Sequence, residues 1–202
     1  MKSEKQNVIE VYVSEIPENV VIESVYPPIR DKEIAEVRND KVRAEKFWVW
    51  KVLLRAIKNI FCVDPEIVNF TKTSSGKWQA DGFYFSLTHS GNKVAVAISS
   101  CEVGVDLEQK SLFFKKITAE KVDRFAEKIA ADSEELPKTP EDLIIMWTKK
   151  ESAYKFVGKG GFSPKKIDTE RFVFKVFDTE EYVLTVCGEN ADKARINIKE
   201  RF

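Results

Sequence analysis

The segment Val103–Glu108 carries two carboxylates, Asp106 and Glu108, in a run that is typical of a β-strand. Side chains at positions i and i+2 of a strand point to the same face, so these carboxylates project together, about 6.5–7 Å apart. Gly104 shares that face and leaves it free of a bulky side chain. Carboxylates this close repel each other unless a cation or a proton intervenes. Oxygen ligands suit Mg²⁺, so the pair indicates a metal site; the alternative is a solvent-exposed strand edge with two unpaired acids.

A second group of candidate residues lies in the segment Trp147–Lys155. On a helix, Trp147, Glu151 and Lys155 occupy positions i, i+4 and i+8 and share one face. Glu151 would then add a third carboxylate, and Lys155 a cation that meets a phosphate. The alternative is a Glu–Lys surface pair worth about 0.2–0.5 kcal/mol beside a buried tryptophan.

The only histidine of the chain, His89, follows an alternating apolar run and lies in a turn of small residues. His89 can donate hydrogen bonds to an anion, together with the hydroxyl of Thr88 or Ser90. The alternative is a histidine that merely occupies a turn. A Ser–His hydrolase is disfavoured, because the chain has no Gly-x-Ser-x-Gly motif to present a nucleophile.

Three further basic residues are candidates for phosphate binding. The tripeptide Ser75-Gly76-Lys77 predicts a tight turn that exposes Lys77, although it does not match a Walker phosphate loop. Arg43 and Lys46, at positions i and i+3 of a predicted helix, share a face. The alternative for this pair is an ordinary solvated helix face.

The elements that must position these residues follow from hydrophobic periodicity. The patterns predict strands at 8–13, 66–71, 82–88, 94–99, 103–108, 171–177, 181–187 and 194–199, and helical segments at 31–60, 117–130 and 139–157. Strand, helix and strands thus occur twice, which predicts an α+β fold of two similar lobes facing each other across a cleft. We expect the lobes to be residues 1–101 and 102–202, with the boundary near Ser99–Glu102. The polar segment Ala131–Lys138 is expected to be a surface loop.

Composition excludes several classes of protein. The chain has 202 residues, with 33 Lys and Arg and 33 Asp and Glu, so its formal charge is zero. This balance argues against binding driven mainly by nucleic-acid phosphates or anionic lipid. The longest stretch without a charged side chain, Gly82–Asn92, is far below the ~18 apolar residues that span a bilayer. The start of the chain shows no secretory signal, and the three widely spaced cysteines predict neither a disulfide framework nor a zinc site, which favours the cytoplasm.

The order and spacing of these motifs resemble those of the 4'-phosphopantetheinyl transferases, specifically the longer, monomeric, two-lobed type. The resemblance spans residues 40–165, and its most specific parts are Gly-x-Asp-x-Glu at 104–108 and Trp-x-x-Lys-Glu at 147–151. It implies a pseudo-two-fold relation between the lobes, with the active site in the cleft. It also implies a Mg²⁺-dependent transfer of the phosphopantetheine arm of coenzyme A to a serine of an acyl or peptidyl carrier protein, with release of adenosine 3',5'-bisphosphate.

The resemblance also implies roles for individual residues. The metal ligands would be Asp106, Glu108 and Glu151, and the catalytic residues Glu151, Lys155 and His89. Coenzyme A would be held by a larger set of residues: Arg43, Lys46, Gly76, Lys77, Thr88, His89 and Lys155. Glu151 is the candidate base for the serine proton, and a water on the metal is the alternative. Two positions depart from the family pattern, since Trp78 replaces a proline and Thr88 replaces a serine.

Carrier proteins of this class are small, acidic and helical. The segment Leu112–Lys116 offers apolar side chains beside two lysines, so we expect it to help dock the carrier; the alternative is that Phe113 and Phe114 belong to the core. Two other functions are weaker alternatives: another Mg²⁺-dependent phosphoryl-transfer enzyme or nuclease, and a non-catalytic protein that binds coenzyme A or a carrier. The three retained acids and Lys155 count against the second.

Overall fold

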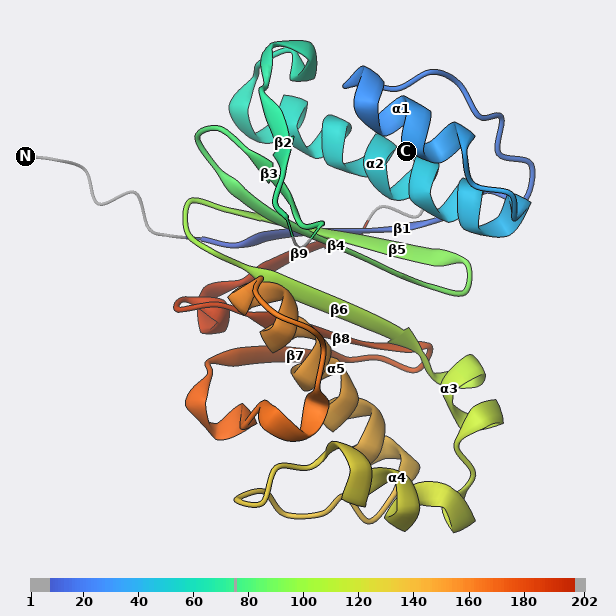
Figure 1. Ribbon diagram of the computed structural model, residues 1–202, viewed down its shortest axis with the longest axis vertical. Coiled ribbons are helices and arrows are strands. Elements are labelled where there is room, and N and C mark those ends of the chain that lie inside the picture. Colours follow the sequence, from blue (N-terminus) through green and yellow to red (C-terminus); the bar gives the residue numbers. More distant parts are fainter. Residues whose placement is uncertain (1–7, 75, 199–202) are drawn as a thin grey trace, which may run out of the picture.

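A computed structural model describes residues 8–74 and 76–198 and shows a mixed α+β fold (Figure 1). The strands are β1 (Glu10–Glu15), β2 (Phe70–Lys72), β3 (Trp78–Ala80), β4 (Tyr84–Ser90), β5 (Lys93–Ser99), β6 (Gly104–Gln109), β7 (Phe174–Asp178), β8 (Tyr182–Cys187) and β9 (Arg195–Ile198). The helices are α1 (Pro28–Ala35), α2 (Asp40–Phe61), α3 (Lys110–Lys116), α4 (Val122–Ile129) and α5 (Pro140–Val157). The predicted α+β class is therefore confirmed.

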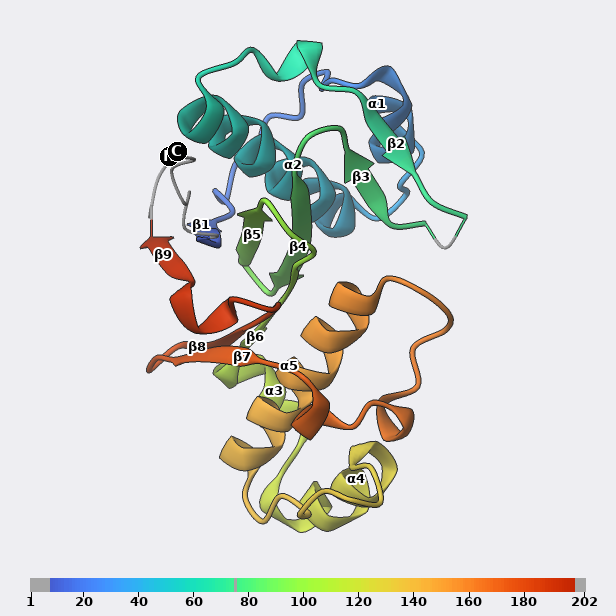
Figure 2. The same cartoon turned by 90° about the vertical axis from the view of Figure 1, so that its left-hand side faces the viewer.

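Two sheets form the centre of the molecule. One has the order β4-β5-β1-β9, and the other has the order β6-β8-β7. Apolar side chains of both sheets, such as Val11, Ala97, Leu107 and Val186, join in one buried cluster between them. Helix α2 covers the outer side of the first sheet and α5 the outer side of the second, so helix, sheet, sheet and helix are stacked in that order (Figures 1 and 2).

Helix α2 covers its sheet because one of its faces is apolar. Trp50, Leu53 and Ile57 are fully buried on this face and pack against strand side chains that include Phe85 and Val96. Burial of one large apolar side chain stabilises a protein by about 1.5–3 kcal/mol, so this face is enough to hold the helix on the sheet.

Helix α5 has the boundaries that its sequence predicts. The side chain of Thr139 accepts a hydrogen bond from the backbone N–H of Asp142, and Pro140 occupies the first turn. Gly158 adopts a left-handed conformation with φ of 64° and ends the helix. The helix packs against β6 and β8, so its face with Glu151 and Lys155 is directed at the strand that carries Asp106.

Several predicted elements need correction. The helical segment predicted at 31–60 is two helices. Helix α1 ends at Ala35, and α2 begins after Asn39, which caps it by accepting from the N–H of Val42. The strand predicted at 66–71 is a 3₁₀ turn at Pro65–Ile67 followed by β2. The hairpin strand β3 and the helix α3 were not predicted; each is too short to show a periodic pattern.

The last strand joins the sheet of the first half. β9 pairs in parallel with β1, from Glu10 opposite Arg195 to Val13 opposite Ile198. Residue 199 of the strand predicted at 194–199, like Ser75 of the predicted turn, lies outside the described residues. The lobe boundary at 101/102 stays a prediction, and β9 shows that the chain crosses back over it.

The structure also bears on the cysteines and on membrane-spanning helices. No disulfide joins Cys62, Cys101 and Cys187, which all lie in the described part of the chain. Within the same part, none of the helices combines the length and apolar character that crossing a membrane requires.

The predicted surface loop at 131–138 is fastened to α5 by a buried ion pair. Glu134 receives hydrogen bonds from the ammonium group of Lys150 and from the N–H and hydroxyl of Thr169. The side chains of Lys150 and Glu134 are 0% and 4% exposed. Burial raises the pKa of Glu134, but the hydrogen bonds from Lys150 and Thr169 outweigh it, so the pKa lies below the ordinary value.

Gly104 lets α5 approach β6 closely. A Cβ atom at this position would lie 1.9 Å from the carbonyl oxygen of Ser152 and 2.6 Å from the backbone nitrogen of Phe156. These are backbone atoms, so no side-chain rotation relieves the clash. The expectation that Gly104 keeps its face clear is confirmed, and the group it makes room for is the backbone of α5.

We predict that Gly104→Ala lowers the free energy of unfolding by about 1–3 kcal/mol, as overpacking of a core does. The measurement is urea unfolding followed by circular dichroism. Gly161→Ala is the matched control, because a Cβ there meets no atom within 4 Å. Equal stability of the two variants would contradict the close approach of α5 to β6.

We predict that Glu134→Gln lowers the free energy of unfolding at pH 7 by about 3–5 kcal/mol, because it leaves the buried Lys150 charge unpaired. Ionised Glu134 stabilises the fold fully above the unfolded-state pKa of about 4.3, and this contribution is lost as the pH falls through the lower folded-state pKa. The difference between variant and wild type should therefore shrink on acidification in pH-dependent unfolding. Glu135→Gln, at an exposed neighbouring position, should have no comparable effect.

Candidate active site

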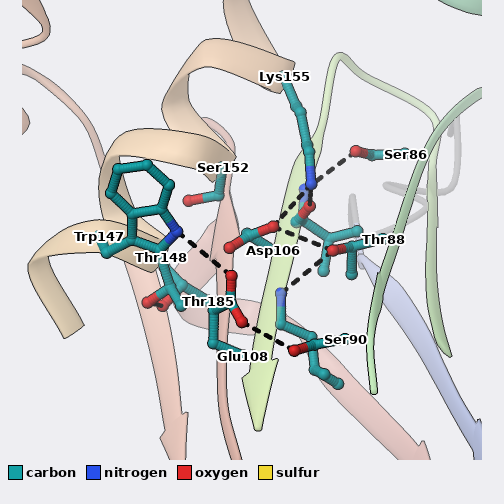
Figure 3. Close-up of polar contacts among 12 residues, drawn as sticks. Ser86, Thr88, Ser90, Asp106, Glu108, Trp147, Thr148, Ser152, Lys155 and Thr185 are labelled. Atoms are coloured by element: carbon teal, nitrogen blue, oxygen red, sulfur yellow. Dashed lines mark hydrogen bonds and ion pairs between the residues drawn. The ribbon is translucent and has the colours of Figure 1, made fainter. Parts of the chain in front are cut away.

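The two predicted carboxylates of β6 lie beneath α5, as Figure 3 shows. Asp106 is 5% exposed, and its Oδ1 accepts from the Lys155 ammonium group at 2.7 Å and from the Thr88 hydroxyl at 3.0 Å. Lys155 also donates to the carbonyl oxygen of Val105 at 3.1 Å. Asp106 and Lys155, which the sequence analysis assigned to a metal and to a phosphate, thus contact each other directly.

Glu108 is held by two donors from two other elements. Its Oε1 accepts from the indole Nε1 of Trp147 at 3.3 Å, and its Oε2 accepts from the hydroxyl of Ser90 at 2.8 Å (Figure 3). Burial raises the pKa of Glu108, and the charge of Asp106 adds to this rise, while the hydrogen bonds from Ser90 and Trp147 oppose it. Trp147, expected to share the face of Glu151, therefore also serves as a hydrogen-bond donor.

Glu151 lies within electrostatic reach of both other carboxylates. Burial and then the charge of Asp106 raise the pKa of Glu151 to about 7; Glu108 adds to the rise and Lys155 opposes it. A carboxyl with this pKa exchanges a proton near neutral pH. The side-chain positions do not form a closed cage, however: among the described residues, no set of three or more His, Cys, Asp and Glu side chains is arranged to hold a metal ion.

One carboxylate oxygen of Asp106 nevertheless has no hydrogen-bond partner. Its Oδ2 is buried and has no hydrogen-bond partner, whereas Oδ1 has two donors. A buried carboxylate oxygen without a partner costs free energy, and such an atom in a native protein calls for an unseen proton, water or ion. The chemistry of the donors fits a hard divalent cation, because all three candidates are carboxylates.

His89 lies beside a buried acid that the sequence analysis did not single out. Its Nδ1 is 3.4 Å from Oε2 of Glu45, which is 7% exposed on α2. Burial lowers the pKa of His89; Lys155 and Lys46 also lower it, and Glu45 and Asp106 oppose them. Glu45 has a signal in the sequence, since it stands on the apolar face of its helix, four positions before Val49.

The predicted phosphate-binding residues have different surroundings. The charge of Lys46 acts on His89, so the first turns of α2 lie near the site. Arg43 instead pairs with Asp40 at the start of its own helix and donates weakly to the carbonyl oxygen of Val37 at 3.5 Å. Thr88 is buried and bonded to Asp106, so its hydroxyl does not face an open surface.

Lys77 lies where the two halves of the chain meet. Its ammonium group donates to Glu102 at 2.9 Å, and its side chain passes over Gly158, at the end of α5. Gly76 has φ of 86°, a conformation that favours glycine. A pocket lies here, and residues from both halves line it: Gly76, Lys77, Trp78, Tyr154, Lys155 and Gly158.

Comparison with known proteins adds independent evidence. The chain is 31% identical over 138 residues to the 4'-phosphopantetheinyl transferase gsp of Aneurinibacillus migulanus, an alignment that covers 67% of this chain and 58% of that protein. It is 28% identical over 128 residues to the 4'-phosphopantetheinyl transferase psf-1 of Bacillus pumilus, which covers 59% of this chain and 52% of that protein. The chain spans about half the length of these curated relatives.

No protein-family model matches it. The resemblance predicted from the motifs is thus confirmed: the chain is a homologue of the 4'-phosphopantetheinyl transferases.

Proposed function

We propose that this chain transfers the 4'-phosphopantetheine arm of coenzyme A to a serine of an apo acyl or peptidyl carrier protein, releasing adenosine 3',5'-bisphosphate. The observation that carries the proposal is the meeting of Asp106 and Glu108 on β6 with Lys155 and Trp147 on α5. These are the residues by which the sequence resembles the transferases. The names of the two relatives support the same reaction class.

We propose Asp106, Glu108 and Glu151 as the residues that would hold Mg²⁺. The partnerless Oδ2 of Asp106 and the raised pKa of Glu151 support this, because both show negative charge without full compensation. When bound, the ion would neutralise charge on the pyrophosphate of coenzyme A. A bound cation would also hold the pKa of Glu151 lower than it is in the metal-free protein.

Side chains of the protein would carry out the remaining steps. Lys155, which lines the pocket, would meet a phosphate oxygen and stabilise charge that builds on the leaving group. His89, with its lowered pKa, would donate a hydrogen bond rather than a full positive charge. Glu151 would accept the proton of the carrier serine. Because a bound cation would lower the pKa of Glu151 below the metal-free value of about 7, a water on the metal is the alternative acceptor.

We propose the pocket beside Gly76 and Lys77 as the site of the adenosine end of coenzyme A. Lys77 would exchange its ion pair with Glu102 for the 3'-phosphate, and Lys46 would add a second cation. Arg43 would have to leave Asp40 to do the same, which makes it the more distant contributor. Thr88 has no direct contact with coenzyme A in this proposal, and its role is the hydrogen bond to Asp106.

The finer architecture belongs to the same proposal. Two lobes related by a pseudo-two-fold, meeting at a cleft that holds the active site, would explain why residues of both halves line one pocket. We propose further that the protein acts as a monomer in the cytoplasm. The balanced charge of the chain agrees with partners that are neither nucleic acid nor membrane.

Helix α3 is the proposed docking element for the carrier. Phe113 is buried, as the alternative interpretation held, whereas Phe114 is partly buried and Lys115 and Lys116 are exposed. Two exposed lysines beside an aromatic ring suit an acidic helical partner. The helix follows β6 directly, so a carrier seated on it would bring its serine toward Glu108.

We predict that the protein adds the mass of a phosphopantetheine arm to an apo carrier protein in the presence of Mg²⁺ and coenzyme A, measured by intact mass spectrometry. Asp106→Ala should slow the transfer at least about 100-fold, because a lost metal ligand costs several kcal/mol of charge stabilisation. Asp192→Ala, at an exposed position, is the control. No mass shift on acyl or peptidyl carriers would contradict the proposal, and cleavage of simple phosphodiesters instead would favour a nuclease.

We predict that Phe114→Ala raises the KM for the carrier about 10-fold and leaves the KM for coenzyme A unchanged, because one interface aromatic contributes on the order of 1–2 kcal/mol. Steady-state kinetics with each substrate varied in turn is the measurement. Phe61→Ala, at another partly exposed phenylalanine, controls for lost packing. An unchanged carrier KM in a folded Phe114→Ala variant would remove α3 from the docking surface.

A further inference from the structure

Three hydroxyl side chains alternate along β4 and face β6. Ser86, Thr88 and Ser90 are all buried, and Figure 3 shows them in a row beside the strand. Each hydroxyl oxygen accepts a hydrogen bond from a backbone N–H of β6: Val105 to Ser86 at 3.0 Å, Leu107 to Thr88 at 3.3 Å and Gln109 to Ser90 at 3.1 Å. We call these three side chains the hydroxyl ladder.

The ladder replaces a missing neighbour strand. β6 is an edge strand that pairs with β8 alone, so alternate N–H groups point away from its sheet. Burying such a group without a partner costs about 1–3 kcal/mol. The side chains of β4, which belong to the other sheet, accept these N–H groups and thereby fix the register between the two sheets.

The hydroxyl protons have a second use. Thr88 donates to Oδ1 of Asp106 at 3.0 Å, and Ser90 donates to Oε2 of Glu108 at 2.8 Å. The same spacing places Gly104, which has no side chain, opposite Ser86. The hydroxyls of Thr88 and Ser90 thus each accept a hydrogen bond from a backbone N–H and donate one to a carboxylate oxygen.

We propose that Thr88 and Ser90 are positioning residues that aim Asp106 and Glu108 at the divalent cation. This inference rests on the proposed function. Thr88 and Lys155 both occupy Oδ1 of Asp106, so the partnerless Oδ2 is the oxygen left for a ligand. The proton of the Thr88 hydroxyl is committed to Asp106, which assigns Thr88 to the carboxylate and not to a phosphate of coenzyme A.

The test is Mn²⁺ binding, measured by electron paramagnetic resonance with coenzyme A present and no carrier protein, so that no transfer occurs. Thr88→Val keeps the shape of the side chain and removes the hydroxyl, and Ser90→Ala removes the other donor. Each should weaken Mn²⁺ binding about 10- to 100-fold, the usual effect of losing a hydrogen bond to a metal ligand. Thr88→Ser should restore binding, because it returns the hydroxyl.

Ser86→Ala is the matched control for lost backbone support, and because Ser86 lines the pocket proposed for coenzyme A, this comparison is also made without coenzyme A. It removes the acceptor of the Val105 N–H but no donor to a carboxylate, so Mn²⁺ affinity should stay within about 3-fold of wild type, well below the usual 10-fold effect. Hydrogen exchange at the amides of Val105 and Leu107 reports the ladder directly: Ser86→Ala should speed exchange at Val105, and Thr88→Val at Leu107. If Thr88→Val fails to fold, Ser90→Ala and Thr88→Ser carry the comparison.

The outcomes separate this inference from the proposed function. Wild-type Mn²⁺ affinity in folded Thr88→Val and Ser90→Ala would overturn the positioning role while the wild type still modifies a carrier. Equal weakening by Ser86→Ala and Ser90→Ala would overturn it too, because it would point to general loss of packing. A wild type that binds no Mn²⁺ and modifies no carrier would overturn both.

Discussion

Like charges repel most strongly where water is scarce, and in this protein the charge of Asp106 acts on the carboxyls of Glu108 and Glu151 in such a place. Asp106 is buried, and the pKa values of Glu108 and Glu151 are raised by burial and by the charge of Asp106. The groups that hydrogen-bond to Asp106 and Glu108 are an ammonium, an indole N–H and two hydroxyls. These donors offset part of the negative charge and leave Oδ2 of Asp106 without a partner. We propose that a divalent cation completes this charge balance.

The fold supplies the geometry that this charge cluster needs. Helix α5 approaches β6 so closely that only glycine fits at position 104, and this contact brings Lys155 onto Asp106. The buried pair of Lys150 and Glu134 fastens the far side of the same helix to the loop before it. Lys150 and Glu151 are consecutive on α5. Lys150 points to Glu134 in the loop before the helix, and Glu151 points toward Asp106 on β6. Stability and chemistry therefore share a single helix, with Lys150 and Glu151 about 100° apart around its axis.

Local patterns in the sequence predict what is local in the structure. The period of two at Asp106 and Glu108, and the period of four at Trp147, Glu151 and Lys155, correctly place these side chains on shared faces. The break between α1 and α2 was missed because apolar spacing continues across the short segment from the end of α1 at Ala35 to the cap at Asn39. The partners of Lys150 and His89 were missed because Glu134 and Glu45 are distant in sequence or hidden in a polar run, and only packing brings such groups together. The pairing of β9 with β1 depends on chain topology, which periodicity does not encode.

The central claim is that Asp106, Glu108 and Glu151 share one divalent cation. The most direct test is a crystal structure of the protein grown with Mn²⁺ and coenzyme A, with the anomalous scattering of manganese used to locate the ion. The account predicts a single manganese peak whose first coordination sphere contains an oxygen of each of the three carboxylates and an oxygen of the pyrophosphate. A peak elsewhere, or coenzyme A bound without manganese beside Asp106, would contradict it.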